Sequence, residues 1–200
     1  MNANLRSTSA VLGFPRIGPQ REVKKALEAY WGDKISAEEL LKVAKEQRLN
    51  TYATIKEQGV DFVPTGTFSL YDHVLDMSNT LGIIPEAYAT SGLSQLDTYF
   101  AMARGHQKGG VDLPATEMKK WFDSNYHYLV PEFSEASEFS LNNLKPVDDF
   151  VEAKEAGYNA RPAIIGPITL LWLGKISKDA KDENFNRYTL LPKLSAVYVE

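Results

Sequence analysis

The sequence predicts an α/β fold, and more specifically the first part of a (β/α) barrel in which helices cover a parallel sheet. Short apolar runs alternate along the chain with segments of helical periodicity. These runs are continuously apolar, as in strands that are buried on both faces. They number three or four in the 200 residues, whereas a closed eight-stranded barrel needs about 250 residues. Because the pattern also runs on to Glu200 without a stop signal, we expect these residues to belong to a larger barrel.

The first predicted elements are a strand and two helices. Residues 10–14 are short and apolar and are ended by Pro15, which indicates a buried strand. Residues 21–31 predict a helix, with the apolar face formed by Val23, Ala26, Leu27 and Tyr30. Ser36 and Glu39 then match a capping box, which predicts a second helix that extends to Gly59.

The remaining segments continue the alternation of strands and helices. We expect strands at 60–64 and 126–131, and helices at 68–81 and 94–102. The glycine-rich segment 104–114 predicts a mobile loop. A helix is expected at 146–156, with Val147, Phe150 and Val151 facing inward. A buried strand is expected at 161–165, followed by one helix directly after it and another in the last residues.

Composition and charge exclude several classes of function. The chain is 44% hydrophobic and 24% charged, which is typical of a globular protein, and its net charge of -4 argues against a general nucleic-acid binder. It contains no cysteine, so disulfides, thiolate metal sites and cysteine nucleophiles are excluded. The longest apolar run, 163–173, is too short to cross a membrane, and the first residues lack a secretory apolar core. We expect a soluble cytoplasmic protein that binds neither membranes nor nucleic acid.

The first candidate site is a group of charges at the start of a helix. Arg21, Glu22, Lys24 and Lys25 lie in the first turns of the predicted helix 21–31. Cations usually favour the opposite end, where the helix dipole is negative. One interpretation is an ordinary solvated first turn. The other is an anion clamp, in which guanidinium, ammonium and free backbone N–H groups bind carboxylates.

The second candidate site is the aromatic and polar segment 121–128, just before a predicted strand. It indicates either a core segment or the wall of a ligand-binding site, in which aromatic faces stack on a ligand and Asn125 forms hydrogen bonds. Lys119 and Lys120 directly precede it and extend a basic path. Thr169 follows a predicted strand and is a weaker candidate for lining a pocket.

Catalytic and metal motifs are absent from the sequence. His73, His106 and His127 do not have the spacing of a helical zinc site, and neither an HExxH nor a GxSxG pattern occurs. The glycines of 104–110 match neither a dinucleotide-binding turn nor a phosphate loop. We therefore predict no catalytic residue and no metal ligand in this chain.

Four segments, in this order along the chain, closely resemble the cobalamin-independent methionine synthases. The similarity covers the chain from about Val11 onward. The segments are LGFPRIG with REVKKA (12–18 and 21–26), YDHVL (71–75), KWFDSNYHY (120–128) and GP through WLGK (166–175).

This resemblance implies a fold and a reaction. Members of the family transfer a methyl group from 5-methyltetrahydropteroyltri-L-glutamate to L-homocysteine, which gives L-methionine, without cobalamin. They have two facing (β/α) barrels of the TIM type. Residues 1–200 would be the N-terminal part of the first, folate-side barrel. The zinc, its ligands and the homocysteine site belong to the C-terminal barrel, which this chain lacks.

The resemblance also assigns roles to individual residues. Arg21, Glu22 and Lys24 match the Arg-Glu-Leu-Lys pattern of the family, with Val23 in place of leucine. Lys120 matches a lysine that binds the glutamate tail, and Asn125 matches an asparagine that contacts the folate. The tail carries several carboxylates, so a cluster of cations suits it on Coulombic and hydrogen-bonding grounds. Lys108 lies in a segment that aligns poorly with the family, and its role stays open.

The reaction itself needs groups that this sequence does not contain. A thiol is a weak nucleophile until a metal lowers its pKa, and an amine nitrogen is a poor leaving group until a general acid protonates it. We therefore expect the 200 residues alone to be inactive.

Two other functions are alternatives. One is a scaffolding barrel segment that supports a partner domain, which would not need Arg21, Lys24 and Lys120 to converge. The other is a glycosidase, for which Asp61 and Asp123 are the obvious carboxylates.

Overall fold

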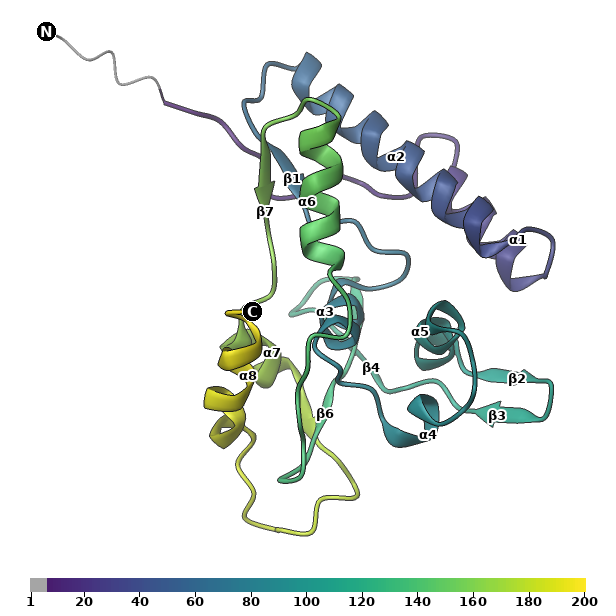
Figure 1. The fold of residues 1–200 in the computed structure, drawn as a ribbon, viewed down its shortest axis with the longest axis vertical. Coiled ribbons are helices and arrows are strands. Elements are labelled where there is room, and N and C mark those ends of the chain that lie inside the picture. Colours follow the sequence, from purple (N-terminus) through teal and green to yellow (C-terminus); the bar gives the residue numbers. More distant parts are fainter. Residues whose placement is uncertain (1–6) are drawn as a thin grey trace, which may run out of the picture. The chain divides into compact units, whose positions relative to one another are not determined.

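The computed structural model describes residues 7–200, which form two compact units (Figure 1). The first contains the described residues up to Leu70 together with Lys145–Ile164. The second contains Tyr71–Leu144 and Ile165–Glu200. Each unit is described by itself.

The first unit contains three helices and a pair of parallel strands, with the first helix packed on the second. Its elements are α1 (Glu22–Trp31), α2 (Ala37–Glu57), β1 (Val63–Thr65), α6 (Lys145–Glu155) and β7 (Ala160–Pro162). Strands β1 and β7 pair in parallel, and both contact α6 (Figure 1). A small core is formed by Tyr52, Ile55, Val63 and Ala153. Two hydrogen bonds of 2.7 and 2.9 Å from Arg48 to the carboxylate of Glu152 join α2 to α6.

The helices of this unit follow the sequence pattern closely. Ser36 and Glu39 form the predicted capping box, with Ser36 N donating to Glu39 Oε2 at 2.8 Å and Glu39 N donating to Ser36 Oγ at 3.2 Å. These two bonds satisfy backbone donors that the helix cannot pair internally. In α1, the predicted face is buried at Val23, Ala26 and Leu27.

The second unit is built from short strands and helices. Its helices are α3 (His73–Thr80), α4 (Glu86–Ala89), α5 (Gln95–Arg104), α7 (Pro167–Leu173), the 3₁₀ helix η1 (Arg187–Leu190) and α8 (Leu191–Val197). Its strands are β2 (His106–Lys108), β3 (Val111–Leu113), β4 (Met118–Lys120), β5 (His127–Leu129), β6 (Glu132–Phe133) and β8 (Lys175–Ile176). Strands β2–β3 and β4–β5 pair antiparallel, whereas β6 and β8 pair in parallel.

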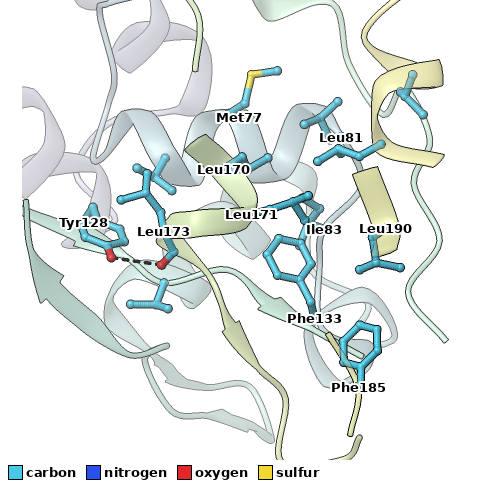
Figure 2. Packing of buried hydrophobic residues seen from close by; sticks show 14 residues of the cluster. Met77, Leu81, Ile83, Tyr128, Phe133, Leu170, Leu171, Leu173, Phe185 and Leu190 are labelled. Atoms are coloured by element: carbon cyan, nitrogen blue, oxygen red, sulfur yellow. Dashed lines mark hydrogen bonds between the residues drawn. The ribbon is translucent and has the colours of Figure 1, made fainter. Parts of the chain in front are cut away.

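The core of the second unit lies where α7 meets α3 and β6. Leu170, Leu171 and Phe133 are fully buried, and Leu81 of the α3 terminus is 1% exposed. Figure 2 shows these side chains together, with the Tyr128 hydroxyl donating to the Leu173 carbonyl at 3.0 Å. This core holds the β5 strand and the start of β8 against α7.

The α/β content is confirmed, but the described residues contain no closed barrel and no continuous sheet. Their strands have only two or three residues and form four separate pairs, two of them antiparallel. More strands form than the three or four predicted, because antiparallel pairs need only a tight turn and arise from segments without a continuous apolar run.

The expected strand at 10–14 is wrong. Only Ala10 forms a bridge, in parallel with Phe62. Leu12 and Phe14 are 81% and 44% exposed. Gly13 and Pro15 explain the failure, since glycine weakens a strand and proline cannot donate to its ladder.

The segment 104–114 is a β-hairpin rather than a loop. Gly109 and Gly110 have φ angles of 62° and 83° and join β2 to β3. A two-residue turn with positive φ at both positions matches the twist of the flanking strands, and glycine adopts it without steric cost. The two glycines therefore form the turn of a hairpin.

Three further expectations need correction. Helix α3 begins at His73 instead of residue 68, because Asp72 caps it. On α6, Val147 and Val151 are exposed, while Asp149 and Ala153 are buried; Asp149 is stabilised there by the Lys145 ammonium at 2.7 Å. The strand expected at 161–165 spans only β7, where Arg161 and Pro162 are exposed.

Candidate functional site

The backbone at the start of α1 has an unusual conformation. Arg21, the N-cap residue, has φ 61° and ψ 37°, in the left-handed region. Its amide donates to the Gly18 carbonyl at 3.0 Å, and the Val23 amide donates to the Ile17 carbonyl at 3.1 Å. Left-handed backbone is costly for a residue with a Cβ atom. This geometry leaves the Arg21 side chain exposed, without an ion pair to any residue in 7–200.

Glu22 and Lys24 differ in how firmly they are held. The Glu22 carboxylate accepts a hydrogen bond from the Gln20 amide at 3.0 Å, so it caps the turn rather than neutralising Arg21. Lys24 Nζ lies 3.6 Å from Glu28 Oε1, and both side chains are more than half exposed. Such an exposed pair contributes only about 0.3–0.5 kcal/mol. An anionic ligand can therefore replace Glu28 as the partner of Lys24.

Lys120 and Asn125 lie at the two ends of one turn in the second unit. Lys120 ends β4 and is paired in register with His127 of β5. Its side chain is exposed and has no ion pair within the described part of the chain, whereas Lys119 lies 3.4 Å from Glu117. Asn125 is exposed, and its side-chain amide has no hydrogen-bond partner among residues 7–200. Both side chains are therefore available to a ligand.

A buried carboxylate beneath this turn was not singled out from the sequence. Asp72 is fully buried and N-caps α3, with Oδ2 accepting from the Leu75 amide at 2.9 Å. The same oxygen accepts from the Leu129 amide of β5 at 3.1 Å. Oδ1 accepts from the Tyr126 hydroxyl at 2.7 Å. One side chain thus joins the helix start to the turn and to the strand that follows it.

Two neighbours extend this network. The Tyr99 hydroxyl accepts from the Tyr71 amide at 3.1 Å and donates to Asp76 Oδ1 at 2.6 Å. Burial, reinforced by the negative charge of Asp76, holds the pKa of Tyr99 well above its usual range. His73 Nδ1 lies 2.9 Å from the Tyr126 hydroxyl. The Asp before a helical run was a visible capping signal, but its contacts with Tyr126 and Leu129 come from residues more than 50 positions away.

The segment 121–128 is divided between the core and the surface, and binding of a ligand by its exposed residues stays a prediction. Tyr128 is buried, and Trp121 and Tyr126 are half-buried against the core of the second unit. Phe122, Asp123 and Asn125 are exposed. The segment therefore leads into the buried strand β5, and its turn exposes side chains to solvent.

The other residues considered in the sequence are dispersed. Thr169 is exposed on α7, and Lys108 lies on the β2–β3 hairpin. Asp61 accepts hydrogen bonds from the amide and hydroxyl of Ser9, at 2.8 and 3.0 Å, and belongs to the first unit, whereas Asp123 belongs to the second. The contacts of Asp61 are those of a structural residue.

The arrangement groups the predicted site residues in two places. Arg21, Glu22 and Lys24 share the start of α1 in the first unit, and Lys120 and Asn125 share the β4–β5 turn in the second. Among residues 7–200, no three His, Asp or Glu side chains are grouped so as to hold a metal ion. Within the same range, no helix is long and apolar enough to span a membrane. Chemically, both places offer binding groups for an anion.

Comparison with known proteins gives a consistent result. Residues 8–200 match the family model described as cobalamin-independent synthase, N-terminal domain. Among curated proteins, the chain is 56% identical to a probable 5-methyltetrahydropteroyltriglutamate–homocysteine methyltransferase of Schizosaccharomyces pombe, over 96% of this chain and 26% of the relative. It is 50% identical to the Saccharomyces cerevisiae methyltransferase of the same name, with the same coverage. For the Flavobacterium johnsoniae protein of that name, identity is 50% over 94% of this chain and 24% of the relative.

The chain thus spans about a quarter of the length of these relatives. The family match covers nearly every described residue, including both groups of candidate binding side chains. The chain therefore belongs to the cobalamin-independent synthase family, and the part of the family that it matches is the N-terminal domain.

Proposed function

We propose that this chain binds the polyglutamate tail of 5-methyltetrahydropteroyltri-L-glutamate, as part of an enzyme that transfers the methyl group to L-homocysteine and forms L-methionine. Arg21, Lys24, Lys120 and Asn125 are the proposed contacts, and Glu22 is proposed as a part of the binding site that positions Arg21. The observation that carries this proposal is the presence of exposed cations without strong acidic partners at positions that match the family's tail-binding pattern. The relatives' own name includes a triglutamate, a ligand with several carboxylates.

The physical chemistry of the two groups supports this assignment. The Arg21 guanidinium offers a planar fork that matches a carboxylate, and Lys24 and Lys120 supply mobile point charges. Glu22 holds the turn through the Gln20 amide, so its role is to position Arg21 rather than to touch the tail. The Asn125 amide can donate to a carboxylate or accept from an amide N–H of the ligand.

The proposed architecture is the N-terminal part of a folate-side (β/α) barrel of the TIM type, the first of two barrels. The parallel pairs β1–β7 and β6–β8 are compatible with this arrangement, since parallel strands joined by helices are its repeating unit. In this proposal residues 1–200 contribute binding and positioning only.

Zinc and homocysteine are assigned to the C-terminal barrel. The described residues do not fit a zinc site, because they contain no suitable cluster of ligands and the sequence has no cysteine. No step through the metal is therefore assigned to these residues. When bound elsewhere in the enzyme, zinc would lower the pKa of the homocysteine thiol.

Calorimetric titration of this chain with triglutamyl and monoglutamyl 5-methyltetrahydrofolate tests the proposal. We expect the triglutamyl form to bind more tightly, and the difference to shrink in Arg21→Ala, in Lys120→Ala and at higher salt. Lys42→Ala on α2 and Lys178→Ala serve as matched controls, because both lysines are exposed and lie outside the proposed contacts. Equal affinity for the two forms, or equal losses in the control variants, would overturn the assignment.

A specific observation favours a second function, that of a scaffolding segment. Ile168 and Trp172 lie four residues apart on α7 and are 61% and 53% exposed, and a contiguous exposed apolar patch often marks a surface that packs against another domain. This function predicts no affinity for either folate. The same titration, on protein shown to be folded by circular dichroism, separates the two functions.

A further inference from the structure

Two aromatic side chains of the second unit stack on each other at the surface. Phe122, in the β4–β5 turn, and Trp172, in α7, have ring centroids 5.6 Å apart and an interplanar angle of 23°. Phe122 is 63% exposed and Trp172 is 53% exposed. A single exposed apolar residue is ordinary on protein surfaces. A stacked pair in which both rings remain more than half exposed instead offers a prepared aromatic surface.

The backbone of Phe122 is strained in a way that displays its ring. Its φ angle is 49°, a left-handed conformation that is a genuine outlier for a bulky residue. The turn around it is closed by Trp121 N, which donates to the Tyr126 carbonyl at 2.7 Å, and by the Ser124 hydroxyl, which donates to the Trp121 carbonyl at 2.5 Å. Strain of this kind persists only where the surroundings over-determine it, and it gathers at functional sites.

The surroundings of this turn are rigid. Tyr126, its last residue, is bonded to the buried Asp72 carboxylate. Trp121 packs edge-on against His73, with ring centroids 4.8 Å apart, and edge-on against Phe122 at 5.3 Å. The exposed ring of Phe122 is therefore held in place before any ligand arrives, which lowers the entropic cost of binding.

We propose that Phe122 and Trp172 form an aromatic platform that stacks on the p-aminobenzoyl ring of the folate substrate. This inference rests on the proposed function. In a pteroylpolyglutamate, that ring is joined by one amide bond to the first glutamate, so a ring-binding surface must lie beside a group that binds carboxylates. Lys120 precedes the Trp121-Phe122 pair directly, and Asn125 follows in the same turn, both with side chains free to meet the ligand. The sequence Lys-aromatic-aromatic thus places a cation and a ring close together, as this junction requires.

The test compares two probes that differ only in the ring, p-aminobenzoyl-γ-triglutamate and γ-linked triglutamate. The ratio of their affinities for the 200-residue chain, by calorimetry, measures the contribution of the ring. We expect the ring to improve wild-type affinity by about twofold to tenfold, the range of an aromatic stacking contact. Phe122→Ala and Trp172→Ala should reduce the ratio to about one and leave the affinity for triglutamate unchanged.

Three controls sharpen the result. Phe122→Gly removes the ring and also relieves the backbone strain, so a loss of the ratio there cannot come from misfolding. Tyr188→Ala removes another exposed aromatic ring, 40% exposed in the same unit, and should keep the ratio. Lys120→Ala should weaken both probes equally, because it acts on the carboxylates.

The outcomes separate the two proposals. If triglutamate binds but the ring adds nothing, the platform is overturned and the tail function stands. If the ring improves affinity equally in wild type and Phe122→Gly, the ring binds elsewhere and the platform is overturned. If neither probe binds the folded chain, both proposals fail.

Discussion

The start of α1 and the β4–β5 turn both contain a residue with left-handed backbone, but different contacts hold the two segments in place. Each places one non-glycine residue in left-handed conformation, Arg21 with φ 61° and Phe122 with φ 49°, and each leaves that side chain exposed. The start of α1 is held by local backbone bonds and by the Glu22 cap. The turn is anchored through Tyr126 to the fully buried Asp72.

The two places therefore offer two different physical means of binding a ligand. Around Arg21 and Lys24 the groups are charged, exposed and weakly paired, so they suit a flexible anionic tail and should respond to salt. The rings of Phe122 and Trp172 are aromatic and fixed, so they suit a rigid ring, and their stacking contact should depend little on salt concentration. The neighbouring Lys120 should depend on salt as Arg21 and Lys24 do.

The largest expected effect is on the stability of the anchored turn. Asp72→Ala removes the α3 N-cap and leaves the amides of Leu75 and Leu129 and the Tyr126 hydroxyl without their acceptor. We expect a loss of about 3 kcal/mol or more in the free energy of unfolding, from a lost cap and buried unsatisfied donors. Urea unfolding followed by tryptophan fluorescence measures it, with Trp121 and Trp172 in the second unit and Trp31 in the first. Arg21→Ala should change the free energy of unfolding by less than about 0.5 kcal/mol. Equal losses in the two variants would contradict the proposed difference between the anchored turn and the start of α1.

At the start of α1, the larger effect should be on binding rather than on stability. Arg21→Ala is expected to weaken γ-linked triglutamate by about tenfold at low salt, since a charge-assisted hydrogen bond to an exposed carboxylate is lost. At about 0.5 M salt the difference between wild type and variant should shrink, because exposed charges are screened. Titration calorimetry at the two salt concentrations provides the values. If the loss of triglutamate affinity in Arg21→Ala did not depend on salt, Arg21 would support the local structure rather than contact the ligand.

Relieving the strain at Arg21 should stabilise the chain and weaken binding together. Arg21→Gly removes the Cβ atom that makes left-handed backbone costly, and the gain is offset in part by the greater entropy of an unfolded glycine. We expect a net stabilisation of about 0.5–1 kcal/mol with the same loss of triglutamate affinity as in Arg21→Ala. Thermal unfolding compared across wild type, Arg21→Ala and Arg21→Gly tests this. If Arg21→Gly were less stable than wild type, the left-handed backbone at Arg21 would not be destabilising the folded state.

The smallest effect concerns pH at the base of the turn. Lys175 donates to Glu117 Oε2 at 2.6 Å, and this hydrogen bond lowers the pKa of Glu117, the residue before β4. A carboxyl whose pKa is lower in the folded state contributes stability above its unfolded pKa of about 4.3 and loses it as the pH falls through the folded value. Wild type should therefore exceed Lys175→Met in stability at about pH 6, and the gap should narrow toward about pH 3. If the stability difference between wild type and Lys175→Met grew as the pH fell, Lys175 would not be stabilising the ionised Glu117 carboxylate.

Local patterns predicted part of this molecule well. The capping box at Ser36 and Glu39 and the buried face of α1 depend on residues three or four positions apart, and both are confirmed. The basic residues at the start of α1 were also visible, because charge is read directly from the sequence. Their role in binding stays a prediction.

Long-range pairing was not visible in the same way. Asp72 meets Tyr126 and Leu129 only after the chain has folded, and no local signal predicts that three donors converge on it. The left-handed conformations of Arg21 and Phe122 have no sequence signature, since glycine or asparagine is the usual residue there. The antiparallel pair β4–β5 was missed because its first strand is polar and exposed.

The most direct measurement of the central claim, that these basic groups bind a polyglutamate tail, is an amide chemical-shift map of this chain titrated with γ-linked triglutamate. The account predicts saturable shifts at amides 19–25, at the start of α1, and at amides 119–126, around the β4–β5 turn, both suppressed by added salt. Shifts confined to other segments, or no saturable shifts at any segment, would contradict it.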